Sequence, residues 1–462
     1  MDNNVKESKG FYKLSWLQRI GFGSGDFAQN LIFQTVMQYV SFFFGTIAGL
    51  PKSAVALLVF IPPVINIFMS MWLGTFVDKH NPKWGKYRSY LLFGGIPLMA
   101  FAVLCFYDGF HGSIVYYFTM YIVMCLLYTV VSLPYGALFA SLTRDVREMD
   151  ILTSTRMVLA NLGGLTIALG VPTMVAYFSP TNTIKGEGDA QAWFYTICIL
   201  AVLGVFLLIF CFSQSKERVI EKTEQAAKIK ASDMWGELMR NSQLRIVALF
   251  IFTAFAMMSI YNAAGAYYTT YFLKAEKLTG WFQGVSFLPA LFLLFIPAIK
   301  KAIGKKQMFI WFLIVAIIGM VLLYIVSTFE ALRSTWLIMV AQFIKSTGII
   351  VATGYMWALV PEVISYGEWK TGKRMPGTIN AVIGIVFQLG MAIGLFFPNM
   401  LLALVGFDKT NVTPLALQGI LWLVAVIPAL LLFVLMFIIS KYELTDKKME
   451  TINKEIEERH LQ

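Results

Sequence analysis

Charged and chemically reactive side chains are scarce in this sequence. Only 14% of the 462 residues are Asp, Glu, Lys or Arg and 58% are hydrophobic, whereas an average soluble domain has about 25% charged residues. The three histidines and four cysteines lack the spacing of a metal site or a disulfide framework. No motif of a hydrolase, a metalloprotease or a nucleotide-binding loop is present. These absences exclude an ordinary soluble enzyme, a disulfide-rich secreted domain and a disordered regulator, and we expect no catalytic site, cofactor or metal.

Long hydrophobic runs are abundant instead. An apolar helix of about 20 residues crosses the roughly 30 Å of a bilayer core, and a helix satisfies its own backbone hydrogen bonds in lipid. The pattern predicts an all-α polytopic protein of the cell membrane with twelve transmembrane helices. The expected spans are 18–45, 54–77, 89–107, 114–140, 151–178, 192–213, 246–273, 281–299, 307–328, 335–361, 377–405 and 415–440.

The connections between these spans differ in charge. Lys and Arg are concentrated in alternate loops, in the terminal segments and in the longest connection, residues 214–245. Basic loops stay on the cytoplasmic side, so we expect both termini there. This placement accounts for the net charge of +11 without a nucleic-acid partner. The long connection divides the chain into six-helix bundles at 1–213 and 246–440, with a cytoplasmic tail at 441–462.

The first span carries a stripe of polar side chains. Asp26, Asn30, Gln34 and Gln38 follow one another at four-residue intervals, which keeps them near one side of a helix. A single Asn or Gln can simply hydrogen-bond to a neighbouring helix. Four polar residues in one stripe, one of them a carboxylate, favour the lining of a cavity, because ionisable groups in a membrane usually face the protein interior.

Other spans also place polar groups near their middle, where transporters keep their substrate sites. Arg156 either extends to the cytoplasmic headgroups or binds ligand hydroxyls and pairs with a carboxylate such as Asp26. Trp357 combines an aromatic face with a polar tip, which suits a sugar. The other residues at this depth are Asn66, Thr129, Ser132, Lys345 and Gln388.

Four strings in the sequence resemble the glycoside–pentoside–hexuronide:cation symporter family, a branch of the major facilitator superfamily. They are GFGSGDFAQN in the first span, WGKYRSYLLFG after the second, LLYTVVSLPYGALFASLTRDVRE in and after the fourth, and WALVPEVISYGEWKTGKRMPG at the end of the tenth. The resemblance implies two six-helix bundles with alternating access. It also implies a sugar or glycoside substrate taken up with H⁺, Na⁺ or Li⁺, and we expect a monomer.

The resemblance further implies roles in sugar binding. Arg156 matches the family's sugar-binding arginine, Ser132 takes the place of a sugar-binding acid, and Gln388 takes the place of a lysine. With the polar and aromatic groups above, the expected substrate-binding residues are Asp26, Asn30, Gln34, Ser132, Arg156, Lys345, Trp357 and Gln388.

The coupling-ion site departs from the family pattern. Asn66 and Ser70 stand where two carboxylates are usual, and a Na⁺ site without carboxylates is weak, so H⁺ is favoured over Na⁺. The expected coupling residues are Asp26, Asn66, Ser70 and Thr129, and the expected gating residues at the cytoplasmic end are Glu362 and Arg374.

Two mechanisms stay open. In a symporter, Asp26 would carry a proton as its surroundings change. In an uncoupled facilitator or exchanger, Lys345 would attract an anionic sugar such as a uronide. A lipid-type carrier of the same fold would need a more apolar cavity than the stripe suggests, and a receptor that does not transport would not need the stripe. We therefore expect a secondary transporter that imports a sugar, glycoside or uronide across the cytoplasmic membrane.

Overall fold

The computed structural model describes residues 12–79, 82–143, 146–180, 182–184, 189–218, 231–373 and 375–461. Helices account for nearly all of them, and no strand occurs in these ranges. The chain forms two compact units, Met1–Ala226 and Ala227–Gln462. The boundary between the units falls inside the long connection at 214–245.

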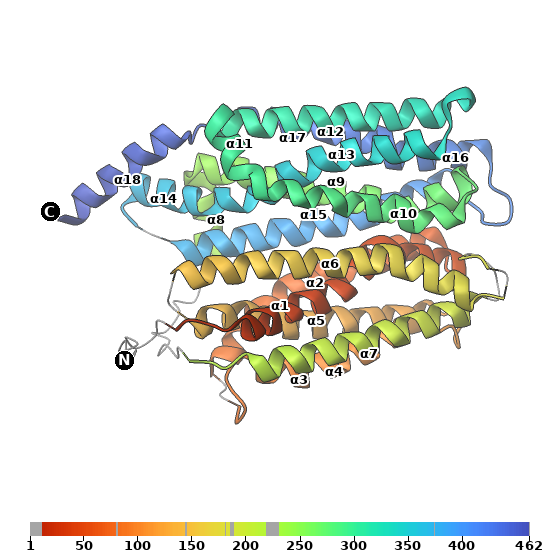
Figure 1. Cartoon of the computed structure of the whole chain (residues 1–462), viewed down its shortest axis with the longest axis horizontal. Coiled ribbons are helices and arrows are strands. Elements are labelled where there is room, and N and C mark those ends of the chain that lie inside the picture. Colours follow the sequence, from red (N-terminus) through yellow and green to blue (C-terminus); the bar gives the residue numbers. More distant parts are fainter. Residues whose placement is uncertain are drawn as a thin grey trace, which may run out of the picture. The chain divides into compact units, whose positions relative to one another are not determined.

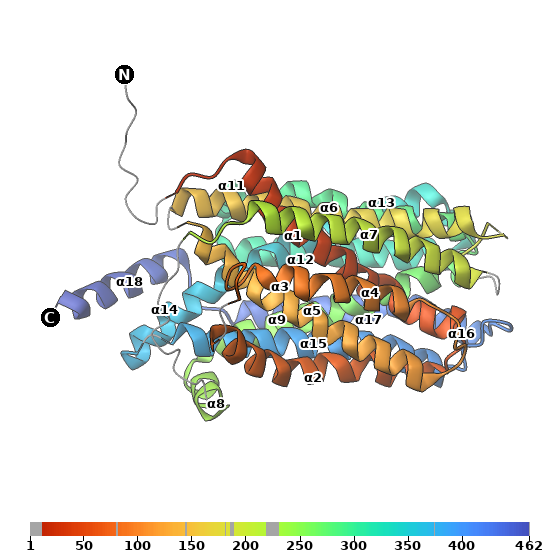
Figure 2. The ribbon, with the colours of Figure 1, turned by 90° about the horizontal axis from the view of Figure 1, so that it is seen from below.

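The first unit is a bundle in which α1 packs against α6 and α7, α2 against α5, and α4 against α5 and α7 (Figures 1 and 2). Two π-helical turns continue α1 in the direction of the sequence. The bounds are α1 Trp16–Thr35, the π turns Val36–Val40 and Phe43–Ile47, α2 Lys52–Lys79, α3 Ser89–Phe93, α4 Gly95–Cys105, α5 Ile114–Leu142, α6 Val146–Phe178 and α7 Ala190–Gln214.

In the second unit, α12 packs against α13 and α17, and α9 against α15 and α17 (Figure 1). The regular helices are α8 Ala231–Arg240, α9 Ser242–Tyr267, α10 Thr279–Gly284, α11 Ile296–Ile303, α12 Lys305–Thr328, α13 Thr335–Tyr355, α14 Leu359–Thr371, α15 Pro376–Leu404, α16 Pro414–Leu421, α17 Ile427–Ser440 and α18 Asp446–Leu461. Tighter 3₁₀ turns lie at Glu276–Leu278, Val285–Phe295, Glu330–Leu332 and Met356–Ala358, and π turns at Tyr268–Phe272 and Trp422–Val426.

The prediction of an all-α multi-pass membrane protein is confirmed. Within the described residues, nine helical stretches are long and apolar enough to cross a membrane, and Ser89–Cys105 is a shorter apolar one. The expected spans 18–45 and 281–299 are helical but are not among the nine. The second of them includes the 3₁₀ segment Val285–Phe295, which contains Pro289. A regular α-helix is interrupted there because proline lacks the N–H that such a helix needs. Twelve crossings, the sidedness of the termini and the six-plus-six division stay predictions.

Side-chain caps begin several of these helices. Ser15 accepts a hydrogen bond from the Gln18 backbone N–H, while the Gln18 side chain accepts one from the Ser15 backbone N–H. This reciprocal arrangement satisfies two donors that a helix start leaves free. Asn241 caps α9 and Ser334 caps α13 with one such hydrogen bond each. The caps set where the helices that carry the functional side chains begin.

Two glycines allow helices to approach at backbone distance. A Cβ atom at Gly163 of α6 would lie 2.8 Å from the Phe27 carbonyl oxygen of α1. A Cβ atom at Gly319 of α12 would lie 2.2 Å from the Lys345 backbone nitrogen of α13. Any larger residue would force the helix pair apart, so these contacts fix the positions of the polar side chains on α1 and α13.

Candidate functional site

A charged triad lies in the first unit, where α1, α5 and α6 contribute Asp26, Tyr135 and Arg156. Arg156 Nε donates to Asp26 Oδ2 over 2.6 Å, and Nη2 donates to Oδ1 over 3.2 Å. The Tyr135 hydroxyl lies 2.6 Å from Asp26 Oδ2 and 2.8 Å from the Phe22 carbonyl oxygen. Both carboxylate oxygens are thus engaged by a guanidinium that holds its charge at any physiological pH. The structure pairs Arg156 with Asp26 instead of extending it to the headgroups.

Aromatic rings surround the guanidinium of Arg156. Its central carbon lies 5.1 Å from the ring centre of Tyr135, 5.3 Å from that of Phe139 and 5.5 Å from that of Phe22. Each ring face attracts the cation, and Phe22 stacks on Tyr135 with their centres 4.8 Å apart. The side chains of Arg156 and Asp26 stay 25% and 17% exposed. The pair is therefore held firmly and is still open to a ligand.

Tyr135 is the member of the triad that sequence reasoning missed. It lies one helical turn beyond Ser132, within the string SLPYG, and that proximity to a predicted site residue was the available signal. Gly25 makes room for its ring, because a Cβ atom there would lie 2.5 Å from Tyr135 Cε2. Tyr135 thus reaches Asp26 only because Gly25, the residue before Asp26, has no side chain.

The remaining polar stripe of α1 bonds mostly to itself. Asn30 Nδ2 donates to the Asp26 carbonyl oxygen over 3.0 Å, and Gln38 Nε2 donates to Gln34 Oε1 over 3.0 Å. Asn30 and Gln34 are half-buried, as is Asp26, whereas Gln38 is buried. The first three residues of the stripe therefore lie on one accessible face of α1.

The structure brings together two of the predicted coupling residues, Asn66 of α2 and Thr129 of α5. Asn66 Nδ2 and Thr129 Oγ1 each donate to the carbonyl oxygen of Cys125 over 3.2 Å. Ser70 donates instead to the Asn66 carbonyl oxygen over 2.7 Å. The Asn66 side chain directs a neutral amide donor at this carbonyl. A carboxylate at position 66 would place a negative charge there instead. Ser132 is half-buried on the same helix as Thr129.

Lys345 of α13 lies inside the second unit and is 0% exposed. Its Nζ is 4.0 Å from the ring centre of Tyr261 in α9 and 5.8 Å from that of Phe282 in α10. Among the described residues Nζ has no hydrogen-bond partner. Removing an ammonium from water costs several kcal/mol, and a desolvated cation–π contact returns about 2 kcal/mol. The charged form is therefore poorly compensated in this conformation.

Trp357 and Gln388 also belong to the second unit. Trp357 lies in the short turn between α13 and α14, is 44% exposed, and packs against Phe255 and Phe387 with ring centres 6.1 and 6.2 Å away. Gln388 follows Phe387 on α15 and is half-buried. Its Oε1 has no hydrogen-bond partner within the described ranges. The exposed aromatic face of Trp357 is suited to the C–H face of a sugar, whereas the Gln388 amide oxygen is buried in this conformation.

The predicted gating residue Glu362 takes part in an ion-pair network. Its Oε2 accepts hydrogen bonds from Lys305 Nζ at 2.5 Å and from the Tyr442 hydroxyl at 2.7 Å, and Lys305 also lies 3.7 Å from Asp446. Burial and the Glu362 carboxylate raise the pKa of Tyr442, which keeps its hydroxyl protonated as a donor. Sequence reasoning missed Lys305 and Tyr442, while the other predicted gating residue, Arg374, lies outside the described residues.

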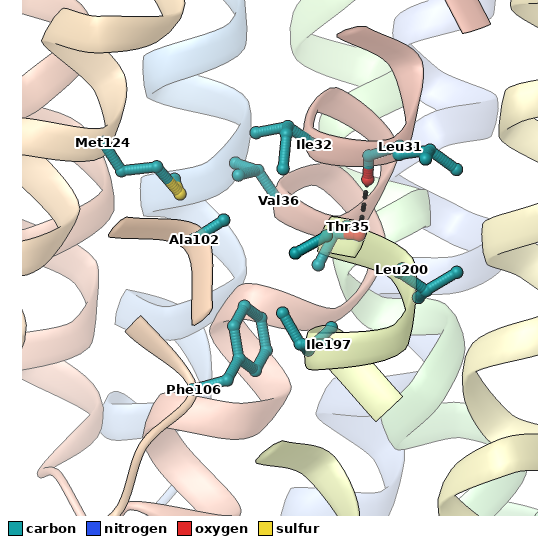
Figure 3. Close-up of a pocket in the computed structure, with 10 residues that line it drawn as sticks. Leu31, Ile32, Thr35, Val36, Ala102, Phe106, Met124, Ile197 and Leu200 are labelled. Carbon is teal, nitrogen blue, oxygen red and sulfur yellow. Dashed lines mark hydrogen bonds between the residues drawn. The ribbon is translucent and has the colours of Figure 1, made fainter. Parts of the chain in front are cut away.

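One small cavity in the first unit is not a sugar site. It measures about 10 Å³, the size of a single water, and is lined by apolar side chains of α1, α4, α5 and α7 and by Thr35. The Thr35 hydroxyl donates to the Leu31 carbonyl oxygen over 2.6 Å, and Figure 3 shows Phe106, Ile197 and Val36 around the same space. None of the predicted site residues lines this cavity.

Comparison with known proteins supports the interpretation of the fold. Residues 21–446 match the family model described as MFS/sugar transport protein. An uncharacterized symporter of Bacillus subtilis, YnaJ, is 39% identical over 99% of this chain and 97% of its own. A glucuronide carrier protein homolog of Escherichia coli is 29% identical over 97% and 96%. A crystal structure of a variant of the nucleoside transporter NupG has a TM-score of 0.66 at 13% identity, covering 91% and 99%, which shows a shared fold.

Proposed function

Because the chain belongs to the MFS/sugar transport protein family of membrane transporters, we propose that it imports a glycoside or uronide by alternating access, coupled to H⁺. The observation that carries this proposal is the Asp26–Arg156–Tyr135 triad. Within a membrane protein such a pair is costly and marks a functional site. A carboxylate and a planar guanidinium also provide the directional acceptors and donors that sugar hydroxyls need.

Substrate binding would begin at this triad in the first unit. Asn30, Gln34 and Ser132 supply further polar groups on α1 and α5. Considered by itself, the second unit offers Trp357 as a residue that could stack against a sugar and Gln388 as one that could hydrogen-bond to a sugar. The relative named as a glucuronide carrier homolog suggests a uronide.

The geometry around Asp26 supports proton coupling. When Arg156 turns to a sugar, the carboxylate loses its counter-charge and can take up a proton. The protonated carboxyl could donate to the Tyr135 oxygen, and the Tyr135 hydrogen could then point to the Phe22 carbonyl, which lies 2.8 Å away. Both charge states of Asp26 therefore find hydrogen-bond partners. Na⁺ is disfavoured because Asn66 and Ser70 provide no carboxylate.

An uncoupled facilitator or exchanger of an anionic sugar is the second candidate. The observation that favours it is the neutral amide of Asn66, which leaves the predicted cation site without a negative charge at that position. In that mechanism Lys345 would act as a fixed positive charge, and no ion would move with the sugar.

Reconstitution in proteoliposomes tests the proposal. Methyl β-D-glucuronide and methyl β-D-glucoside differ only in the C6 carboxylate, so the pair separates anion recognition from sugar recognition. We expect uptake of at least one member of a glycoside and uronide panel that contains this pair, accumulation driven by an inward pH gradient, and its loss with a protonophore. Absence of flux for the whole panel would contradict transport. Flux without accumulation under either H⁺ or Na⁺ gradients would favour the facilitator.

A further inference from the structure

Lys345 differs from Lys305, the other buried cation among the described residues of the second unit, in having no acceptor. Lys305, which is 2% exposed at its side chain, contacts Glu362. Lys345 is enclosed completely, and Nζ faces the rings of Tyr261 and Phe282 with no hydrogen-bond partner in the part of the chain that the structure describes. Three N–H donors of an ammonium therefore remain unsatisfied.

The neighbours of Lys345 on each packed element are neutral. Tyr261 of α9 is the titratable group that faces Nζ, and α10 presents Phe282. From α12, Gly319 packs on the backbone of Lys345. No charged group among the described residues acts on the ammonium. A position of this kind is better filled by a hydrophobic residue if its role is packing alone, so the lysine calls for a role that uses its amine.

The wall that shields Nζ is built on irregular structure. Phe282 lies in α10, a helix of six residues followed by the 3₁₀ segment Val285–Phe295, which contains Pro289. Gln342, one turn before Lys345, holds this segment through hydrogen bonds to the Phe282 carbonyl oxygen at 3.0 Å and to Ser286 Oγ at 2.7 Å. Breaking these two bonds would let the segment separate from α13 and admit water to Nζ.

We propose that Lys345 is a second proton-exchange site of the transport cycle, located in the second unit and separate from Asp26. Water that reaches Nζ allows the neutral amine to bind a proton with its lone pair. As Phe282 moves back over the amine, and before the last water is excluded, an N–H bond breaks, its electron pair stays on nitrogen, and the proton leaves on the departing water. This inference rests on the proposed transport function and adds a coupling group to it.

Two substitutions separate proton exchange from fixed charge. Lys345→Met keeps the length and removes the charge, whereas Lys345→Arg keeps a charge that does not titrate in proteins. Methyl β-D-glucuronide is used in two measurements. The exchange rate is measured in loaded proteoliposomes at equal pH on both sides. The extent of accumulation is measured separately under an inward pH gradient of about one unit. Lys301→Met, at an exposed position, is the matched control for loss of a lysine.

We expect both Lys345 variants to retain exchange, and both to accumulate about tenfold less sugar, because one coupled proton contributes a factor of ten per pH unit. The Lys301 variant should match the wild type. If Lys345→Met accumulates as much sugar as the wild type, the inference is overturned and Asp26 is left as the sole proton carrier. Wild-type accumulation in Lys345→Arg, or loss of exchange in a Lys345→Met protein that is folded by its thermal transition, would overturn it in favour of anion binding. Wild-type protein that exchanges none of the panel sugars would instead contradict the proposed function itself.

Discussion

Two cations inside the helical units, Arg156 and Lys345, have opposite surroundings. Arg156 pairs with Asp26 through two hydrogen bonds, lies against three aromatic rings and keeps a quarter of its side chain exposed. Lys345 is fully enclosed, has one close ring and has no acceptor among the described residues. Each cation thus stands in an environment that matches its own chemistry, since guanidinium cannot lose its charge and an amine can.

The difference suggests a division of labour between the two units. A permanently charged, paired and accessible arginine is suited to hold a polar substrate. An unpaired, shielded lysine is suited to change its charge when the shield opens. Variants that exchange, weaken or remove these features test whether the contrast is functional.

Arg156→Ala should abolish uptake. The substitution removes the bidentate donors and leaves the Asp26 carboxylate without a counter-charge. Loss of two charge-assisted hydrogen bonds to the sugar, at about 1.5–3 kcal/mol each, lowers uptake roughly 100-fold or more. Uptake of methyl β-D-glucuronide is measured per amount of protein in the membrane.

The control for this experiment is Arg156→Lys, which keeps the charge but loses the second hydrogen bond and should retain partial uptake. Unchanged uptake in the alanine variant would remove Arg156 from the substrate site, and the comparison with Lys345 would then describe packing alone.

Tyr135→Phe should lower uptake about tenfold, because a hydrogen bond to a charged group contributes about 1.5–3 kcal/mol. The ring stays to pack on Phe22. Tyr117→Phe is the matched control, since the Tyr117 hydroxyl donates to Asp108 over 2.7 Å at the other end of α5. Both variants should unfold at lower temperature, but only the first should lose transport per folded molecule. Equal transport in the two would mean that Tyr135 supports the fold and not the triad.

Gly25→Ala should lower uptake by a smaller factor, about threefold to tenfold, because overpacking costs about 1–3 kcal/mol and part of it can relax. The new Cβ would lie 2.5 Å from Tyr135 Cε2 and push the ring from Asp26. At Gly136, next to Tyr135 on α5, a Cβ would meet nothing within 4 Å. Gly136→Ala should therefore leave uptake unchanged. Similar uptake for both alanine variants would show that the ring can shift freely.

Tyr261→Leu should have the smallest effect and should act through Lys345. In the water-filled state in which Lys345 is charged, loss of the ring removes about 0.5–1 kcal/mol of cation–π stabilisation. A higher proton concentration is then needed to charge it, so the pH midpoint of sugar accumulation moves down by about half a unit. Tyr261→Phe keeps the ring face and should shift the midpoint less. Identical pH profiles for the leucine variant and the wild type would exclude a role of this ring in coupling.

The fold followed from the sequence where local rules decide it. Nine expected spans appear as long apolar helices and a tenth as a shorter one, because hydropathy is a property of each segment alone. The segment at 281–299 deviates where Pro289 interrupts the regular hydrogen bonds. The stripe at Asp26, Asn30 and Gln34 was also predictable, since helical spacing places these residues on one face.

The site could be predicted only in part. Its charged members were visible because Asp26, Arg156 and Lys345 are exceptions within hydrophobic runs. Tyr135 was not, since the sequence contains 20 tyrosines and most apolar spans carry some. The donors of the Glu362 network, Lys305 and Tyr442, likewise resemble ordinary residues at helix ends until the helices are packed.

Composition and hydropathy are enough to identify a helical membrane protein with a few costly polar groups, because the cost of a charge in hydrocarbon depends on the residue and its segment. The tertiary structure decided which of these groups meet. Asp26 and Arg156 are separated by 130 positions, and their pairing depends on the close contact of α1 with α6. The isolation of Lys345 depends in the same way on Gly319, Tyr261 and Phe282 from three other elements, since only packing brings an acceptor to a cation or withholds one.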